Sequence, residues 1–204
     1  METQVYLVRH GETLWNREQR LQGQLDSPLT ENGILQAEEL ARYLDHHFFD
    51  TIFSSDLERA AHTARIIASH KQGDHRIIMD ERIRERHFGN FQGLTWKEVT
   101  ERFPNDAAKE VAGNPMNVIP GGESKHQLLL RVKVFFEELV KLHEGKKILV
   151  ISHGGVVNVW TRQVLKIPFD VPRRFYLGNS SISIFNHSDD GWYVRTLGYT
   201  PDLN

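Results

Sequence analysis

Short apolar runs rich in β-forming residues recur along the chain, and longer segments with apolar residues at helical spacing separate them. Each run is too short for a helix and stops at polar or turn-forming residues, which is typical of buried strands. The last two runs flank Asp190-Gly191, a turn signal, and predict an antiparallel hairpin. The predicted strands cover residues 5–8, 51–54, 76–79, 147–151, 181–185 and 192–196.

The intervening segments predict helices. Thr30 and Asp56 stand where an N-cap residue is expected, and the apolar residues that follow each of them fall on one face. In the first helix this face holds Leu35, Leu40, Tyr43 and Leu44, and in the second Leu57, Ala60, Ala61, Ala64, Ile67 and Ala68. Further helices are expected over residues 96–103, 124–143 and 156–165, the middle one with Leu128, Val132, Phe135, Phe136, Leu139 and Leu142 as its core stripe.

Strands that alternate with helices predict an α/β fold of three layers, with a mostly parallel central sheet and helices on both faces. No internal repeat or linker interrupts the pattern, so residues 1–204 are expected to form a single domain. Residues 104–122 contain three prolines and three glycines. Such a segment is typical of a long mobile loop, and we expect it to act as a lid over a substrate and, together with Arg86, to set specificity.

The composition excludes several classes of function. Lys and Arg number 25 and Asp and Glu 27, a net charge of −2 that argues against a nucleic-acid partner. Cysteine is absent, which excludes disulfides, thiol nucleophiles and Cys-ligated metals. The first apolar stretch, Val5–Val8, is too short for a secretory signal, and no stretch could span a membrane, so we expect a cytoplasmic protein.

Two predicted strands share an unusual ending, since each delivers a histidine followed by glycine. Residues 5–8 lead into Arg9-His10-Gly11, and residues 147–151 lead into Ser152-His153-Gly154. Ligands bind to open α/β sheets in the crevice at the carboxyl ends of the strands. If the two strands are neighbours, His10 and His153 therefore face one crevice, whereas a single such histidine would more often be incidental.

Arg59 and Glu85 are weaker candidates when they are judged from the residues alone. Arg59 lies one turn into the helix after the second strand, where a guanidinium could bind a phosphate or carboxylate, or could pair on the surface with Asp56 or Glu58. Glu85 lies between Arg84 and Arg86 and could equally be a solvated carboxylate among arginines.

The segment around His10 resembles the Arg-His-Gly signature of the histidine phosphatase superfamily, which includes the phosphoglycerate mutases. The resemblance continues in the same order along essentially the whole chain and is closest to the broad-specificity phosphatase branch. The matching blocks are Arg9-His10-Gly11-Glu12-Thr13, Gln22-Gly23, Asp26 to Thr30, Ser54 to Ala60, Glu85 with Gly89 and Gly93, Gly121 to Ser124, and Ser152 to Gly155.

The resemblance implies a role for each matching residue. His10 would be the nucleophile that becomes phosphorylated, and Glu85 the proton donor. Arg9, Arg59 and His153 would bind the phosphoryl group. Asn16, Gln22, Gly23 and Gly154 would line the pocket around it, with Gln22 the weakest assignment because its loop varies in the family.

These roles agree with what phosphoryl transfer requires. Cations must stabilise the charge on the transferred group, and the attacking nitrogen must be unprotonated. Arg9 and Arg59 should favour neutral His10 by lowering its pKa from the usual value of about 6.5. A metal ion or cofactor is not required, and the sequence lacks a His-Glu-x-x-His metal motif.

The sequence therefore predicts a metal-independent phosphatase that hydrolyses small phosphorylated metabolites through a phosphohistidine, as a monomer or homodimer. A cofactor-dependent phosphoglycerate mutase-type phosphotransferase is the main alternative. The resemblance favours hydrolysis over mutase activity, because the stretch from Arg59 to His153 is shorter than in the family's mutases and the pair Glu12-Thr13 is more similar to its phosphatases. A non-catalytic phosphate-binding module is a second alternative, although His10, Glu85 and His153 are all present.

Overall fold

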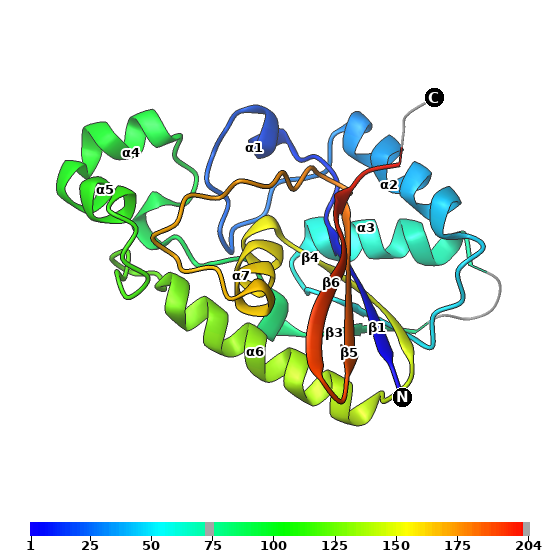
Figure 1. Cartoon of the computed structure of the whole chain (residues 1–204). Coiled ribbons are helices and arrows are strands. Elements are labelled where there is room, and N and C mark those ends of the chain that lie inside the picture. Colours follow the sequence, from blue (N-terminus) through cyan, green and yellow to red (C-terminus); the bar gives the residue numbers. More distant parts are fainter. Residues whose placement is uncertain (72–75, 202–204) are drawn as a thin grey trace.

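A computed structural model describes residues 1–71 and 76–201 (Figure 1). In this part of the chain the strands are β1 (Thr3–Arg9), β2 (Thr51–Ser54), β3 (Ile77–Met79), β4 (Lys147–Ser152), β5 (Ile182–Ser188) and β6 (Gly191–Tyr199). The α-helices are α1 (Leu14–Arg17), α2 (Glu31–Leu44), α3 (Glu58–Ser69), α4 (Trp96–Arg102), α5 (Pro104–Val111), α6 (Lys125–Leu142) and α7 (Gly154–Leu165). Two short 3₁₀ helices, η1 (Glu81–Ile83) and η2 (Gly89–Phe91), lie between β3 and α4. None of the described helices is long and apolar enough to cross a bilayer.

The strands form one mixed sheet in the order β3-β2-β4-β1-β5-β6. Strands β3, β2, β4 and β1 are parallel, and β5 and β6 form the antiparallel hairpin at the other edge. The α/β fold with a mostly parallel sheet is therefore confirmed. Strands β1 and β4 are neighbours, with Arg9 paired to Ser152, so the two strand-end histidines leave the sheet side by side.

Helices cover both faces of the sheet, as the alternation of the strands requires. Helices α6 and α7 pack over the face that carries Leu7 and Val150. Helices α2 and α3 pack over the opposite face, against Val8 and Ile151. Figure 1 shows α6 and α7 on one side of the strands and α2 and α3 on the other.

Two predicted helix faces are partly wrong. Leu35 and Tyr43 are exposed on α2, and Leu142 is exposed near the end of α6. Helix α2 instead buries Ala37 and Ala41 together with Leu40 and Leu44. Small side chains allow α2 to lie close to α3 and the sheet, so the buried face follows helix geometry and not the bulk of its apolar residues.

The cap of α3 also differs from the prediction. Asp56 pairs with Arg84 and does not cap the helix, whose N-cap is Leu57 with no side-chain hydrogen bond. The free N–H groups of Glu58 and Arg59 donate instead to the carboxylate of Asp26, at 2.7 and 3.3 Å. A carboxylate from a loop more than thirty residues earlier thus caps this helix.

The segment expected to be a long loop is helical over its first part. Pro104 occupies the first turn of α5, where its missing N–H costs nothing, and Ala107 is buried beneath it. Helices α4 and α5 enclose a third apolar cluster of Phe91, Val99, Ala107 and Ile119. These helices lie at one end of the molecule, far from the β5–β6 hairpin (Figure 1).

The core under α6 predicts a clear contrast between two phenylalanines. Phe136 is fully buried and stacks on Trp160, with 4.2 Å between ring centroids, whereas Phe48 is 73% exposed. Phe136→Ala should lower the free energy of unfolding by about 3–5 kcal/mol, because it leaves a cavity. Phe48→Ala should change it by less than about 0.5 kcal/mol. Urea unfolding measures both, and equal losses would contradict this account of the core.

Candidate functional site

The site lies at the carboxyl ends of three neighbouring parallel strands. His10 follows β1, Ser55 follows β2 and His153 follows β4. The backbone ladder continues past the strand ends, since His10 N–H donates to Ser152 O at 3.0 Å and Ser55 N–H to Ile151 O at 2.9 Å. The rings of His10 and His153 meet edge to face, 5.2 Å apart between centroids. The pairing of the strands therefore sets the spacing of the two histidines.

The hydrogen bonds of His10 determine which ring nitrogen is available. Its Nδ1 lies 2.7 Å from the carbonyl oxygen of Gly11, which can only accept, so Nδ1 carries the proton. The Nε2 atom of the neutral ring therefore keeps its lone pair. Burial lowers the pKa of His10 well below its ordinary value, and the positive charges of Arg59 and Arg9 lower it further. Both effects favour the neutral, nucleophilic form.

The guanidinium of Arg59 is almost completely buried and is held mainly by backbone carbonyls. It donates to Gly23 O at 2.6 Å, to Leu25 O at 2.8 Å and to the Asp26 carboxylate at 2.9 Å. The surface pairing with Asp56 or Glu58 that the sequence left open is not what the structure has. Gly23 has φ +58°, which favours glycine, and a Cβ there would lie 2.2 Å from Oε1 of Gln92, so a larger residue would displace the Gln92 side chain from the turn that presents this carbonyl.

Arg9 occupies the opposite wall of the site. One guanidinium nitrogen donates to Leu177 O at 2.6 Å, in the segment that leads into β5. Its Nε atom is buried and has no hydrogen-bond partner among the described residues, and the same holds for Nε of Arg59. Each arginine thus keeps a buried N–H group that no atom of the described residues satisfies.

Glu85 is bound at the start of α7 and is not a solvated surface carboxylate. Its Oε2 accepts the N–H of Gly155 at 2.9 Å, and its Oε1 accepts the N–H of Arg86 at 2.7 Å. A Cβ on residue 155 would lie 1.9 Å from Oε1, so a larger residue there would displace the Glu85 carboxylate from this position. The backbone of Glu85 is held from α6, where Arg131 donates to its carbonyl oxygen at 2.8 Å.

The neighbouring arginines all have other partners. Arg82 pairs with Asp80 and Glu138, Arg84 with Asp56, and Arg86 with Glu110. Arg86 is buried and packs its guanidinium on Phe88. Arg86 therefore braces the loop that follows Glu85, and the expectation that specificity lies around Arg86 stays a prediction.

His153 is fully buried beside these groups. Its Nε2 lies 2.8 Å from Oγ of Ser55, and its Nδ1 has no partner among the described residues. Burial lowers the pKa of His153 well below its ordinary value, and the nearby Arg59 and His10 lower it further. A dianion in the site would oppose this shift, because it would stabilise the imidazolium.

These groups surround a pocket of about 150 Å³. Eight of the nine residues predicted for the site line it, and His153 lies against His10 just outside the lining. Besides the unpaired Nε atoms of both arginines, the buried Oε1 of Gln22 has no partner among the described residues. The predicted residues that line the pocket are Arg9, His10, Asn16, Gln22, Gly23, Arg59, Glu85 and Gly154.

Several further residues line or brace the pocket. Arg20, Leu21 and Phe88 complete the lining, but no periodicity or motif marked them. Asn179 bridges His10 O and Asn16 Oδ1, at 3.1 Å each, and Thr63 accepts the N–H of Gly11 at 3.1 Å. The short spacing from Arg20 to Gln22 is the one available signal for Arg20.

Chemically, the pocket suits a small anion. The buried guanidinium of Arg59, the half-buried Arg9 and the N-terminus of α7 supply positive potential. Within the described residues no group of three or more His, Asp or Glu side chains is placed to hold a metal ion. The unpaired buried N–H groups are what an oxyanion would satisfy.

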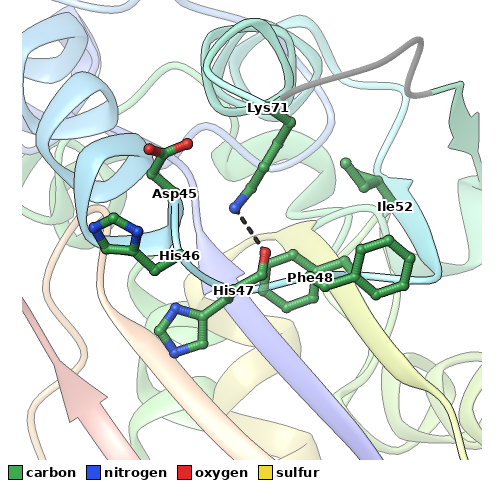
Figure 2. Close-up of a pocket in the computed structure, with 7 residues that line it drawn as sticks. Asp45, His46, His47, Phe48, Ile52 and Lys71 are labelled. Carbon is green, nitrogen blue, oxygen red and sulfur yellow. Dashed lines mark hydrogen bonds between the residues drawn. The ribbon is translucent and has the colours of Figure 1, made fainter.

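A larger pocket of about 410 Å³ lies at the opposite end of the sheet, where α2 ends and β2 begins. Figure 2 shows Lys71 reaching across it to the carbonyl oxygen of His47, at 2.9 Å. Lys71 also donates to Leu44 O, so its ammonium group caps the last turn of α2. This pocket has none of the residues of the strand-end site.

Comparison with known proteins agrees with this arrangement. The model of the histidine phosphatase superfamily (branch 1) matches residues 5–200. A curated relative, the probable phosphoglycerate mutase GpmB of Enterobacter sp. (strain 638), is 39% identical over 200 residues, covering 96% of this chain and 92% of the relative.

Two solved structures have the same fold. Bacillus stearothermophilus YhfR superposes with a TM-score of 0.90 at 31% identity, covering 98% of both chains. A phosphoserine phosphatase variant from Entamoeba histolytica, solved with phosphoserine, superposes with a TM-score of 0.88 at 30% identity, covering 99% of this chain and all of the other.

The buried histidines should make stability fall in acid. Because the folded-state pKa of His153 is below the unfolded value of about 6.5, the unfolded chain binds the proton first. This contribution to stability is therefore complete above about pH 6.5 and declines as the pH falls. His153→Gln should remove this pH dependence. Below about pH 6.5 the unfolding free energy of the wild type should therefore fall relative to that of the variant, by up to about 1.4 kcal/mol per pH unit. Urea unfolding between pH 5 and 8 measures this, and a difference independent of pH would contradict it.

Proposed function

The chain belongs to the histidine phosphatase superfamily (branch 1), and we propose that it is a phosphatase that hydrolyses small phosphomonoesters through a phosphohistidine on His10, with all activity in one domain over residues 1–204. The observation that carries the proposal is the state of His10. Its Nδ1 is engaged with Gly11 O, which leaves the Nε2 lone pair in a pocket lined by Arg9 and Arg59.

In the first step Nε2 of His10 attacks phosphorus in line with the ester bond. The N–P bond forms as the P–O bond to the alcohol breaks, and charge on the three equatorial oxygens is stabilised by the Arg9 and Arg59 guanidinium groups and by the imidazolium of His153. Glu85, in its carboxylic acid form, gives its proton to the departing alkoxide. The alcohol then leaves, and Glu85 remains as a carboxylate.

In the second step water attacks the phosphohistidine. Glu85 is then the base that removes a proton from the water as the O–P bond forms. The N–P bond breaks, neutral His10 is restored, and inorganic phosphate leaves. The hydrogen bonds from Gly155 and Arg86 hold the carboxylate in one place for both roles. Since the arginines supply the charge, the proposal requires no metal ion.

Mutase-type transfer is the second candidate, and the curated relative's description as a probable phosphoglycerate mutase supports it. The two activities share the phosphohistidine and differ in what accepts the phosphoryl group. Structural neighbours described as phosphatases, together with the short stretch from Arg59 to His153, favour water as the acceptor. Incubation with 3-phosphoglycerate separates the two, because a phosphatase releases inorganic phosphate whereas a mutase yields the isomerised ester.

His10→Ala should abolish both turnover and the acid-labile phosphoenzyme, because it removes the ring nitrogen that attacks phosphorus, and His153 lies outside the pocket lining. The measurement is rapid-quench labelling with a ³²P-phosphomonoester, alongside phosphate release. His70→Ala, at an exposed histidine at the end of α3, is the matched control and should label normally. Labelling of the His10 variant at the wild-type level would refute the assignment.

Glu85→Gln should slow the first step mainly for substrates with a basic leaving group. An alkoxide needs a proton to depart, so phosphorylation by an alkyl phosphate should fall by roughly 10²–10⁴-fold. p-Nitrophenolate leaves without a proton, so its first step should fall much less. Phosphoenzyme should then accumulate, since the second step lacks its base.

Rapid-quench comparison of the two substrates tests this role. Glutamine keeps an amide oxygen that can still accept one of the two backbone N–H groups, so the loop should stay in place. Glu137→Gln, on the outer face of α6, is the matched control. Equal slowing of both first steps would mean that another group protonates the leaving oxygen.

A further inference from the structure

A second, larger cavity opens beside the phosphate-sized pocket. It has a volume of about 330 Å³ and shares Leu21 and Phe88 with that pocket. We call it the apolar chamber, and its volume lies in the range of about 300–1,000 Å³ that small-molecule sites occupy. Its lining consists of Leu21, Phe88, Phe91, Trp96, Glu110, Val111 and Ile119.

The chamber is formed by the α4–α5 end of the molecule. Phe91 and Ile119 are buried and form its floor as part of the third apolar cluster. Trp96 at the start of α4 and Val111 at the end of α5 stand at its rim, 39% and 72% exposed. Large apolar side chains around an open cavity, which shares two lining residues with a polar pocket, form a surface that an apolar ligand would cover.

We propose that the apolar chamber binds the organic part of the substrate, and that this part is an uncharged alkyl or aryl group. The inference rests on the proposed function, since it places the phosphoryl group beside His10. Leu21 and Phe88, which line both cavities, then mark the boundary that the ester would cross. A phosphomonoester of this class would fill both cavities at once.

The charged groups around the two cavities support an uncharged organic part. Glu110, the one charged residue of the chamber lining, is held by Arg86 at 2.6 Å and by Lys125 at 3.0 Å. Two cations share this one carboxylate, so each has a carboxylate partner although the group as a whole keeps one positive charge. On the other side of Leu21, Arg20 donates to Glu18 at 2.8 Å and to Glu98 at 2.9 Å.

Arg20, Arg86 and Lys125 thus already have carboxylate partners. A carboxylated substrate would have to displace Glu18 or Glu98 from Arg20, or Glu110 from Arg86 and Lys125. Phosphoserine and 3-phosphoglycerate carry such a carboxylate, and apolar esters do not. The structure therefore favours apolar phosphomonoesters over carboxylated ones.

Binding of n-alkyl phosphonates from ethyl to hexyl tests the inference without any need for hydrolysis. Isothermal titration calorimetry with the full-length protein should show affinity rising with chain length, by up to about fourfold for each methylene that reaches the chamber. The heat capacity change should become more negative along the series, as burial of apolar surface requires. A carboxyalkyl phosphonate of similar length should bind more weakly than its alkyl counterpart.

Val111→Lys places a cation at the rim and should reverse both trends. The alkyl series should flatten, and the carboxyalkyl phosphonate should gain at least severalfold in affinity. Val134→Lys makes the same change at a similarly exposed position on α6, outside both cavities, and should keep the wild-type trends. Trp96→Ala, which removes the other rim side chain, should reduce the slope of the alkyl series on its own.

The outcomes separate this inference from the proposed function. A flat alkyl series in the wild type, or identical slopes in the Val111 and Val134 variants, would overturn the chamber even if His10 is phosphorylated normally. Absence of a phosphohistidine with every ester would instead overturn the proposed function, and a rising phosphonate series would then show only that the chamber binds apolar groups. Wild-type phosphohistidine together with the rising series supports both.

Discussion

The burial of the Arg59 guanidinium is the constraint on which the site depends. A buried cation is costly unless it is well hydrogen-bonded, and here backbone carbonyls meet most of that need. Carbonyl dipoles hold the group in place without cancelling its charge. A single carboxylate, Asp26, contributes as well, and it also caps α3 and so ties the arginine's helix to the loop that wraps it.

The positive charge that Arg59 keeps acts on His10 and His153. Burial and the nearby guanidinium groups lower the pKa of both His10 and His153, so the protein holds two neutral rings between two cations. A phosphate dianion reverses the balance. It compensates the arginines, satisfies the unpaired Nε groups and makes an imidazolium at His153 favourable. The site is therefore preorganised for a doubly charged group.

The sequence predicts the positions of those site residues that directly follow a buried strand. Buried strands are recognisable from their apolar residues, and parallel pairing brings their ends together, so the pattern of residues is enough to place His10 and His153 in one crevice. Contacts between residues far apart in the sequence, such as that between Asp26 and α3, could not be predicted in the same way. Asp26 lies far along the chain from α3, and no local pattern separates it from Asp56, the nearer candidate for the cap.

The chamber could not be predicted from the sequence for a related reason. Its wall is assembled from α4, α5, the loop at Phe88 and the segment around Ile119, each short and weakly patterned. The prediction that residues 104–122 influence specificity concerns the segment that supplies Glu110, Val111 and Ile119 to the chamber, and it assumed an irregular lid. The structure instead shows that Pro104 starts a helix there, which presents Val111 at the rim. Closure of this segment over a substrate stays a prediction.

The division into two cavities also bears on which acceptor takes the phosphoryl group. Under the proposed function, the charged groups of the small pocket would stabilise phosphoryl transfer, and the pocket would bind any phosphomonoester in the same way. The chamber would hold the alcohol product by apolar contacts alone, which are not directional. Once the P–O bond breaks, nothing aligns that alcohol for attack on the phosphohistidine. A mutase needs such alignment, because it must return the phosphoryl group to a second hydroxyl of the same molecule. A site that releases its alcohol and admits water is therefore better suited to hydrolysis.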